Sequence, residues 1–191
     1  FVRFVSQFVG EGLRGVSLAV VECNREQIGL VALGTARALG CQIRPVMLDE
    51  LLARPLAVLG DARAIVTTDC HRQEVNAAAG SLGLPIYRIA LESEFAQSLV
   101  QRAKQGPVLM VVRDAHFEGP WRRLMKQLKV PNEVAERFSF TEPKGLLAAL
   151  RVMRIKPAVF VSPLVEHEIP AGIIDHTLRM PSSRYVEQAS L

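Results

Sequence analysis

Three times along the chain, an apolar run typical of a buried strand ends in a short polar segment and continues as a helix-like pattern. The runs with their polar ends span residues 16–24, 64–71 and 108–114. In open α/β sheets, ligands bind at the carboxyl ends of the strands, beside helix N-termini that favour polar and anionic groups. The pattern therefore predicts where a site lies before it indicates a chemistry.

Strand-like and helix-like segments alternate along most of the sequence, and Gly and Pro fall between them. Strands rich in Val, Ile and Leu without polar alternation are typical of parallel sheets covered by helices on both faces. We therefore expect an α/β fold with two Rossmann-like lobes and largely parallel sheets, while a single larger doubly wound sheet is the alternative. Strands are predicted at 16–22, 42–47, 63–67, 85–90, 107–112, 134–140 and 157–161, and helices at 25–39, 49–58 (interrupted near Pro55), 70–79, 93–105, 118–129 and 143–153.

The order of these segments predicts two lobes with a further segment at each end. Residues 1–15 form a short amphipathic start and a turn, 16–90 the first lobe and 91–165 the second. The tail, 166–191, carries a strand-like stretch and is expected to return toward the first lobe. A ligand is expected between the two lobes.

Composition limits the class of protein. The 23 basic and 19 acidic residues give a net charge of +4, which is compatible with a nucleic-acid partner without demonstrating one. Three cysteines without framework spacing favour a reduced, cytoplasmic setting. No apolar run is long enough to cross a bilayer, so no membrane partner is expected. The chain starts with Phe1 and lacks a signal pattern, so we expect a segment upstream of it.

The first polar segment contains Glu22, Cys23 and Asn24. Asn24 is a good helix N-cap, and Gln27 three residues later completes a capping-box pattern. Glu22 and Cys23 stand where the strand ends, and a buried Glu22 would need a partner. A ligand is one candidate for that partner, and a structural role is the other.

The second polar segment contains Thr67, Thr68, Asp69 and His71 and is the densest in polar groups. Either Thr68 or Asp69 can cap the following helix. Hydroxyl groups, helix amides and an imidazole also make a cradle for a small anion. We expect ligand binding here.

The third polar segment contributes Arg113, which can grip a carboxylate or phosphate group through two parallel hydrogen bonds or pair with Asp114. Ser162 ends a later strand and is a weaker ligand-binding candidate. Nucleotide-binding, phosphate-loop and serine-nucleophile motifs are missing from the sequence, and the histidines lack zinc-site spacing. We therefore predict no catalytic residue, no metal and no cofactor.

One resemblance concerns the cysteines at the strand ends. Cys23-Asn24 and Cys70-His71 look like motifs of aspartate and glutamate racemases, in which two cysteines from different lobes exchange an α-proton across a cleft. Here both cysteines fall within the first lobe, where they do not readily flank a substrate. A cysteine-dependent, racemase-like enzyme acting on a small amino or carboxylic acid is therefore only the alternative function.

A second resemblance covers nearly the whole chain and is to the effector domain of some GntR-type bacterial transcriptional regulators, similar to periplasmic solute-binding proteins. It implies a preceding winged-helix DNA-binding domain, with residues 1–15 as the remnant of a linker, and a homodimer. The expected function is then a non-catalytic sensor of a small polar or anionic effector, not an enzyme. The motifs that carry the resemblance are Val20–Asn24 with Gln27, Arg44–Leu51, and Val66-Thr67-Thr68 with His71, Glu74 and Val75.

Overall fold

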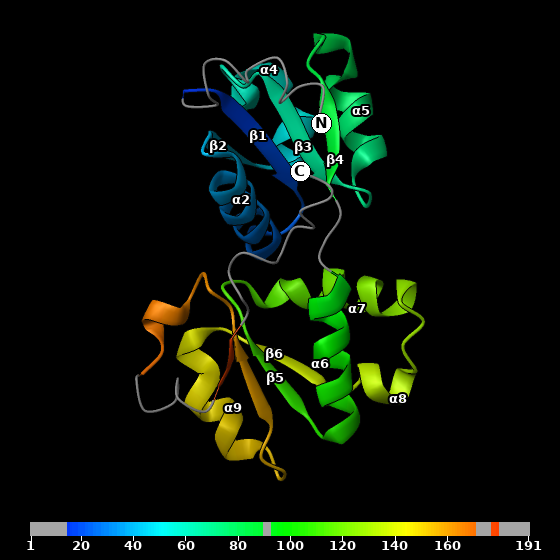
Figure 1. Ribbon diagram of the computed structural model, residues 1–191, viewed down its shortest axis with the longest axis vertical. Helices are drawn as coiled ribbons and strands as arrows, with labels where there is room; N and C mark the ends of the chain where they lie inside the picture. The colour runs from blue at the N-terminus through cyan, green and yellow to red at the C-terminus, as the bar shows by residue number, and fades with distance from the viewer. Residues whose placement is uncertain (1–14, 90–92, 171–176, 180–191) are drawn as a thin grey trace. The chain divides into compact units, whose positions relative to one another are not determined.

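The chain forms two compact units, each built around its own parallel sheet (Figure 1). The computed structural model describes residues 15–89, 93–170 and 177–179. Residues 15–89 belong to the first unit, and the other two ranges belong to the second.

The first unit holds a four-stranded sheet in the order β2-β1-β3-β4, with every neighbouring pair parallel. The central strands β1 and β3 are buried along their whole length, as their unbroken apolar sequences predict. The edge strand β2 is mostly accessible and accommodates Pro45, which has no N–H to offer a neighbour. The strands are β1 (Ser17–Glu22), β2 (Gln42–Met47), β3 (Ala64–Thr68) and β4 (Ile86–Ile89).

Helices follow the strands of the first unit and bury apolar side chains against the sheet. Leu51 of α3 and Val75 of α5 are fully buried in the same core cluster as Ala19 and Ile65 of the central strands. The predicted interruption near Pro55 is confirmed, because Pro55 begins a second short helix after Arg54. The helices are α2 (Arg25–Leu39), α3 (Leu48–Ala53), α4 (Pro55–Leu59) and α5 (Arg72–Ala79), and a 3₁₀ turn covers Gly80–Leu82.

Gly60 follows the last residue of α4 and has a backbone conformation that residues with a Cβ atom rarely adopt. Its φ is 54° and its ψ is −119°, and a Cβ atom there would lie 3.1 Å from the Arg44 guanidinium. Arg44 also pairs with Asp61 at 2.8 Å. We expect Gly60→Ala to lower the free energy of unfolding by about 1–3 kcal/mol, because backbone strain adds to displacement of Arg44.

Gly80 offers the matched control for this change. It has φ −61° and ψ −30°, and a Cβ atom there would meet nothing within 4 Å. Gly80→Ala should therefore leave stability unchanged or raise it by about 0.4–1 kcal/mol. Urea unfolding of both variants measures the difference, and equal stabilities would contradict the account of Gly60.

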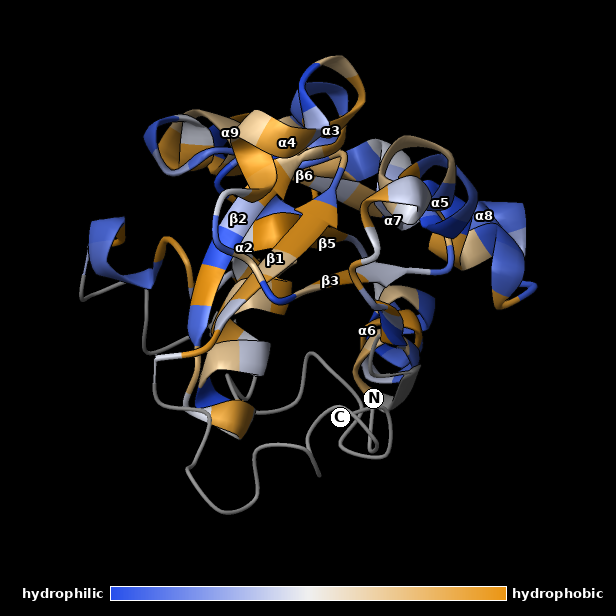
Figure 2. Cartoon of the chain, turned by 90° about the horizontal axis from the view of Figure 1, so that it is seen from above, coloured by the Kyte–Doolittle hydropathy of each residue, from blue (hydrophilic) through white to orange (hydrophobic). Residues whose placement is uncertain are grey.

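The second unit repeats the strand arrangement of the first. Its sheet has the order β6-β5-β7-β8 and is parallel throughout. The strands β1 and β5 are coloured as strongly apolar in Figure 2, in agreement with their complete burial. The predicted α/β fold with parallel sheets is confirmed, whereas the likeness to periplasmic solute-binding proteins stays a prediction. The strands are β5 (Val108–Val111), β6 (Phe138–Thr141), β7 (Ala158–Val161) and β8 (Thr177–Arg179).

The helical segments of the second unit depart from the predicted pattern at one place. A strand is expected over 134–140, but Asn132–Ala135 forms the short helix α8 and the strand β6 begins at Phe138. The reason is local: Pro131 is the N-cap of α8 and the acidic Glu133 lies in its first turn, where negative charge is favoured, and the apolar pattern does not show this. The other helices are α6 (Ser93–Gln105), α7 (Glu118–Gln127) and α9 (Leu146–Val152), with 3₁₀ turns at Ala115–Phe117, Pro143–Gly145 and Glu166–Glu168.

Part of the tail is described, and it joins the second sheet. Residues Thr177–Arg179 form β8, which pairs in parallel with β7 from Val159 to Val161. The prediction that the tail returns toward the first lobe rests on tail residues other than 166–170 and 177–179, and these lie outside the described ranges. Residues 1–14 also lie outside the described ranges. Among the described residues, no helix combines the length and the apolarity that crossing a bilayer requires.

Candidate functional site

The polar segments that follow the central strands lie at the point where the strand order of each sheet reverses. In the first unit the chain runs from β1 outward to β2 and then back to β3 on the other side of β1. Open α/β sheets bind ligands at such a switch point, outside the carboxyl ends of the two strands. Glu22 ends β1 and Thr68 ends β3, so both occupy the switch point of the first sheet.

Glu22 is a carboxyl group with no solvent exposure at this switch point. The paired register of β1 with β3 ends at Val21 and Thr67, and beyond it the N–H of Thr68 donates to Glu22 Oε1 at 2.8 Å. This bond ties the two central strands together and gives Glu22 Oε1 a structural partner. The second oxygen, Oε2, is buried and accepts no hydrogen bond from the described residues.

Burial raises the pKa of the Glu22 carboxyl group above its ordinary value of 4.5. The cause is desolvation, because a charged carboxylate loses its hydration inside the protein. The hydroxyl and N–H groups of Thr68, the imidazole of His71 and the hydroxyl group of Thr67 act in the opposite direction and offset only part of it. Glu22 is therefore an acid that holds its proton to higher pH than an exposed glutamate.

His71 faces the free oxygen of Glu22. Its Nε2 lies 3.7 Å from Glu22 Oε2, and its Nδ1 lies 3.6 Å from Glu74 Oε1. Both distances are longer than a hydrogen bond but within the range of an ion pair. The imidazole thus lies between two carboxyl groups, with 10% of its side chain exposed.

Two hydroxyl groups complete the buried part of the site. Thr67 is fully buried and Thr68 is 3% exposed, and both hydroxyl groups lie close enough to the Glu22 carboxyl group to lower its pKa, although neither Oγ1 has full hydrogen-bond geometry with a described residue. Buried polar atoms are ordinarily paired, so atoms without a partner at a switch point indicate a place where a ligand or water contributes the missing bonds. Together, Glu22, Thr67, Thr68, His71 and Glu74 form what we call the acid–histidine cluster.

Because the pKa of Glu22 is raised in the folded chain, its contribution to the free energy of unfolding falls as the pH rises. A carboxyl group whose folded-state pKa exceeds its unfolded value stabilises the fold below about 4.5, and that stabilisation is lost as the pH rises through the folded-state pKa. Glutamine in place of Glu22 stays neutral and can still accept from Thr68. We expect Glu22→Gln to match the unmodified chain near pH 4.5 and to exceed its stability at pH 8 by about 1–3 kcal/mol.

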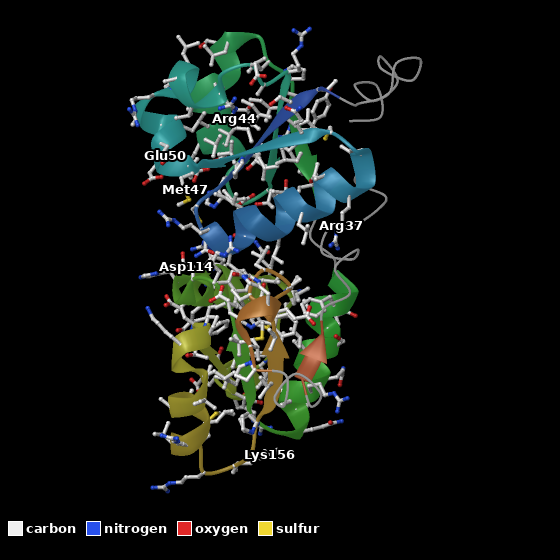
Figure 3. All side chains as sticks on the ribbon, turned by 90° about the vertical axis from the view of Figure 1, so that its left-hand side faces the viewer. Arg37, Arg44, Met47, Glu50, Asp114 and Lys156 are labelled. Atoms are coloured by element: carbon white, nitrogen blue, oxygen red, sulfur yellow. The ribbon has the colours of Figure 1, made fainter. Side chains whose placement is uncertain are left out.

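Thermal unfolding from pH 4.5 to pH 8 measures this difference. Glu50→Gln is the matched control, because Glu50 is an exposed glutamate of α3 in the same unit (Figure 3). The control should follow the unmodified chain at every pH. A stability gap for Glu22→Gln that stays constant or reverses between the two ends of the range would contradict a protonated Glu22.

The remaining predicted residues of the first unit have structural roles around the cluster. The predicted cap by Asn24 is confirmed: its Oδ1 accepts from the N–H groups of Glu26 at 2.8 Å and Gln27 at 3.3 Å. Gln27 Oε1 makes no hydrogen bond with the described residues, so the reciprocal half of the capping box is missing. Cys23 is half-buried.

The predicted helix cap by Thr68 or Asp69 is wrong. The helix α5 begins at Arg72 after His71, without a side-chain cap, and Asp69 instead pairs with Arg88 of β4 at 2.9 Å. A two-residue turn between Thr68 and His71 moves the helix start beyond the reach of both side chains. This turn also places His71 beside Glu22.

Arg113 and Ser162 lie at the corresponding switch point of the second sheet, after β5 and β7. Arg113 is exposed and donates to the carbonyl oxygen of Leu164 at 3.0 Å. Ser162 is buried, and its Oγ accepts from the N–H of Leu164 at 3.2 Å. These contacts hold the loop after β7, and the predicted binding role of both residues stays a prediction, as does the cleft between the lobes.

The second unit also has a surface hollow at the start of α7. Its lining includes His116, Glu118 and Arg122, and the two charged residues pair with each other across one helical turn at 2.6 Å. The His116 side chain is 96% exposed and contacts Asp114. Since its charged groups satisfy each other, this hollow offers less chemistry than the acid–histidine cluster. Among the described residues, no three His, Cys, Asp or Glu side chains gather closely enough to hold a metal ion.

Two residues in or near the acid–histidine cluster, Glu74 and Arg88, are not among the binding residues predicted from the sequence. Glu74 lies one helical turn beyond His71, and the three-residue spacing is the signal that places both on one face of α5. Arg88 could not be found in this way, because it comes from another strand and meets Asp69 only through the pairing of β3 with β4.

Comparison with known proteins gives few matches. No family model and no curated protein matches the chain. Among solved structures, ATP-bound MatB from Rhodopseudomonas palustris is 12% identical, with a TM-score of 0.35, over 93% of this chain and 46% of that one. The amide bond synthetase McbA from Marinactinospora thermotolerans is 14% identical, with a TM-score of 0.34, over 84% of this chain and 41% of that one. The chain thus spans less than half the length of these two proteins.

These similarities correct the predicted function. The structures found include a synthetase and an ATP-bound protein, and neither is a transcriptional regulator. The prediction of a non-catalytic sensor domain, and with it the prediction that the chain is not an enzyme, is contradicted. At TM-scores near 0.35 the similarities assign no substrate and no reaction to this chain. The homodimer and the upstream DNA-binding domain stay predictions from the sequence.

Proposed function

We propose that the first unit carries the site of an enzyme that moves a proton to or from a small polar substrate, with Glu22 and His71 as its acid–base pair. The observation that supports this most is the position of Glu22 Oε2, which is fully buried, unbonded and 3.7 Å from His71 Nε2. Titratable groups with shifted pKa values at a ligand-binding position are typical of catalytic sites.

The two members of the pair differ in a way that suits acid–base chemistry. Desolvation raises the pKa of Glu22, so the carboxyl group keeps its proton to higher pH than an exposed glutamate and is the acid of the pair. A neutral imidazole has one nitrogen that accepts a proton and one that donates a proton. Because His71 lies at the edge of the surface and Glu22 is fully buried behind it, a substrate contacts the imidazole, and the imidazole passes the proton to or from Glu22.

The hydroxyl groups of Thr67 and Thr68 lie beside the Glu22 carboxyl group and are the other polar groups of the site that can bond such a substrate. A hydroxyl group both donates and accepts, so these two groups suit a molecule with hydroxyl, carbonyl or carboxylate oxygens. The N-terminus of α5 follows His71 directly and favours an oxygen that carries negative charge. We therefore propose a small oxygen-rich metabolite as the substrate and partner of this site.

A screen in deuterated water tests the proposal and identifies the substrate in the same experiment. Small hydroxy acids, keto acids and sugars that raise the melting temperature of the chain are incubated with it, and proton NMR records conversion or deuterium uptake. We expect at least one of these molecules to be converted or labelled by the unmodified chain. Binding without conversion or labelling in any case would overturn the proposed enzyme.

The cellular location that we propose is the cytoplasm. No disulfide joins the described cysteines Cys23, Cys41 and Cys70, and Cys70 is an exposed thiol. Free exposed thiols fit a reducing compartment better than an oxidising one.

A further inference from the structure

The acid–histidine cluster forms a graded series from the interior to the surface. The side-chain exposure is 0% at Glu22, 10% at His71 and 46% at Glu74. The two ring nitrogens of His71 face the two carboxyl groups, Nε2 toward Glu22 at 3.7 Å and Nδ1 toward Glu74 at 3.6 Å. A buried acid that reacts repeatedly must exchange protons with water, and Glu22 has no solvent contact of its own.

We propose that His71 and Glu74 form the proton path between Glu22 and bulk water. In the outward direction, Glu22 Oε2 releases its proton to His71 Nε2, and the ring releases the proton on Nδ1 to Glu74 Oε1. Glu74 then gives that proton to water. Glu22 ends ionised, Glu74 returns to its ionised form, and the neutral ring of His71 is left with its proton on Nε2 until the inward transfer returns a proton to Nδ1. The inward direction reverses these steps.

The surroundings leave this route as the most direct one. On β3 the neighbours of Glu22 are the hydroxyl groups of Thr67 and Thr68, which are both buried. The nearby acid Asp69 is already paired with Arg88 of β4. The helix α3 packs against α5 and carries the exposed acids Asp49 and Glu50.

This inference rests on the proposed function, because a proton path is needed only if Glu22 reacts repeatedly. Its test needs no substrate. Carbon-13 NMR follows the Glu22 carboxyl carbon through its titration and reports how fast the protonated and ionised forms interconvert. In the unmodified chain we expect one signal that moves with pH, because the path keeps exchange fast. In His71→Gln we expect two separate signals, with exchange slowed about tenfold or more.

Glu74→Gln provides the second arm, since Glu74 is exposed and its replacement leaves the core intact. We expect a several-fold slower exchange of Glu22 in this variant. Glu50→Gln, at an exposed position of α3, is the matched control and should leave exchange unchanged. Rapid exchange in both His71→Gln and Glu74→Gln overturns the proton path. If His71→Gln does not fold, the Glu74→Gln result decides alone.

The two proposals can fail separately. Rapid exchange in these variants, combined with conversion of a metabolite by the unmodified chain, removes the path and keeps the enzyme. Slow exchange in the variants, combined with no conversion or labelling of any screened molecule, keeps the path and removes the enzyme.

Discussion

Glutamine in place of Glu22 or His71 is expected to lower turnover of the converted metabolite by about 100- to 10,000-fold, the usual contribution of a general acid or base. Both substitutions remove the group that carries the proton and keep a polar side chain of similar size. Glu22→Gln also keeps an oxygen that can accept from Thr68 at the end of β1, where the native distance is 2.8 Å. The strand contact should therefore survive while the chemistry is lost.

Initial rates on the metabolite found by the screen measure this loss, with melting temperatures recorded for each variant. Glu50→Gln serves as the control and should retain the full rate, because Glu50 is exposed on α3. A variant of Glu22 that folds and turns over at the unmodified rate would contradict the assignment of the pair.

Alanine in place of Phe160 is expected to lower the free energy of unfolding of the second unit by about 3–5 kcal/mol. Phe160 lies on the central strand β7, is 2% exposed and packs against Phe95 with ring centroids 5.3 Å apart. Its removal leaves a cavity between the sheet and α6 that neighbouring side chains only partly fill. Calorimetry should show the transition of the second unit moving to lower temperature.

The same experiment tests whether the two units unfold separately. Each unit has its own core cluster, and Leu51 is a fully buried member of the cluster in the first unit. Leu51→Ala should lower the other transition by about 2–5 kcal/mol and leave the transition that Phe160→Ala affects in place. A single transition that both substitutions lower equally would contradict independent units.

Much of the fold follows from the sequence because its central strands carry an unusually clear signal. Continuous apolar runs bounded by polar ends locate β1, β3 and β5 within a residue or two, and Pro55 marks the break between α3 and α4. The error at α8 arises where a short apolar stretch allows both a helix and a strand, and only the preceding Pro131 separates them. The pairing of β8 with β7 has no local signature, because it depends on a distant register.

The site was only partly predictable. Glu22, Thr67, Thr68 and His71 stand out because polar side chains end buried strands, and the structure brings them together at one switch point. Their roles depend on distances and burial that the sequence does not contain. Full burial of Glu22 and its 3.7 Å approach to His71 turn a set of expected ligand contacts into an acid–base pair.

The measurement that tests the central claim most directly is the titration of Glu22 itself by carbon-13 NMR in the unmodified chain. A buried acid facing His71 should show a titration midpoint above 4.5, the ordinary value for a glutamate, because burial favours its protonated form. A midpoint at or below 4.5 would mean that Glu22 is an ionised structural carboxylate, and would contradict the acid–base pair proposed for the first unit.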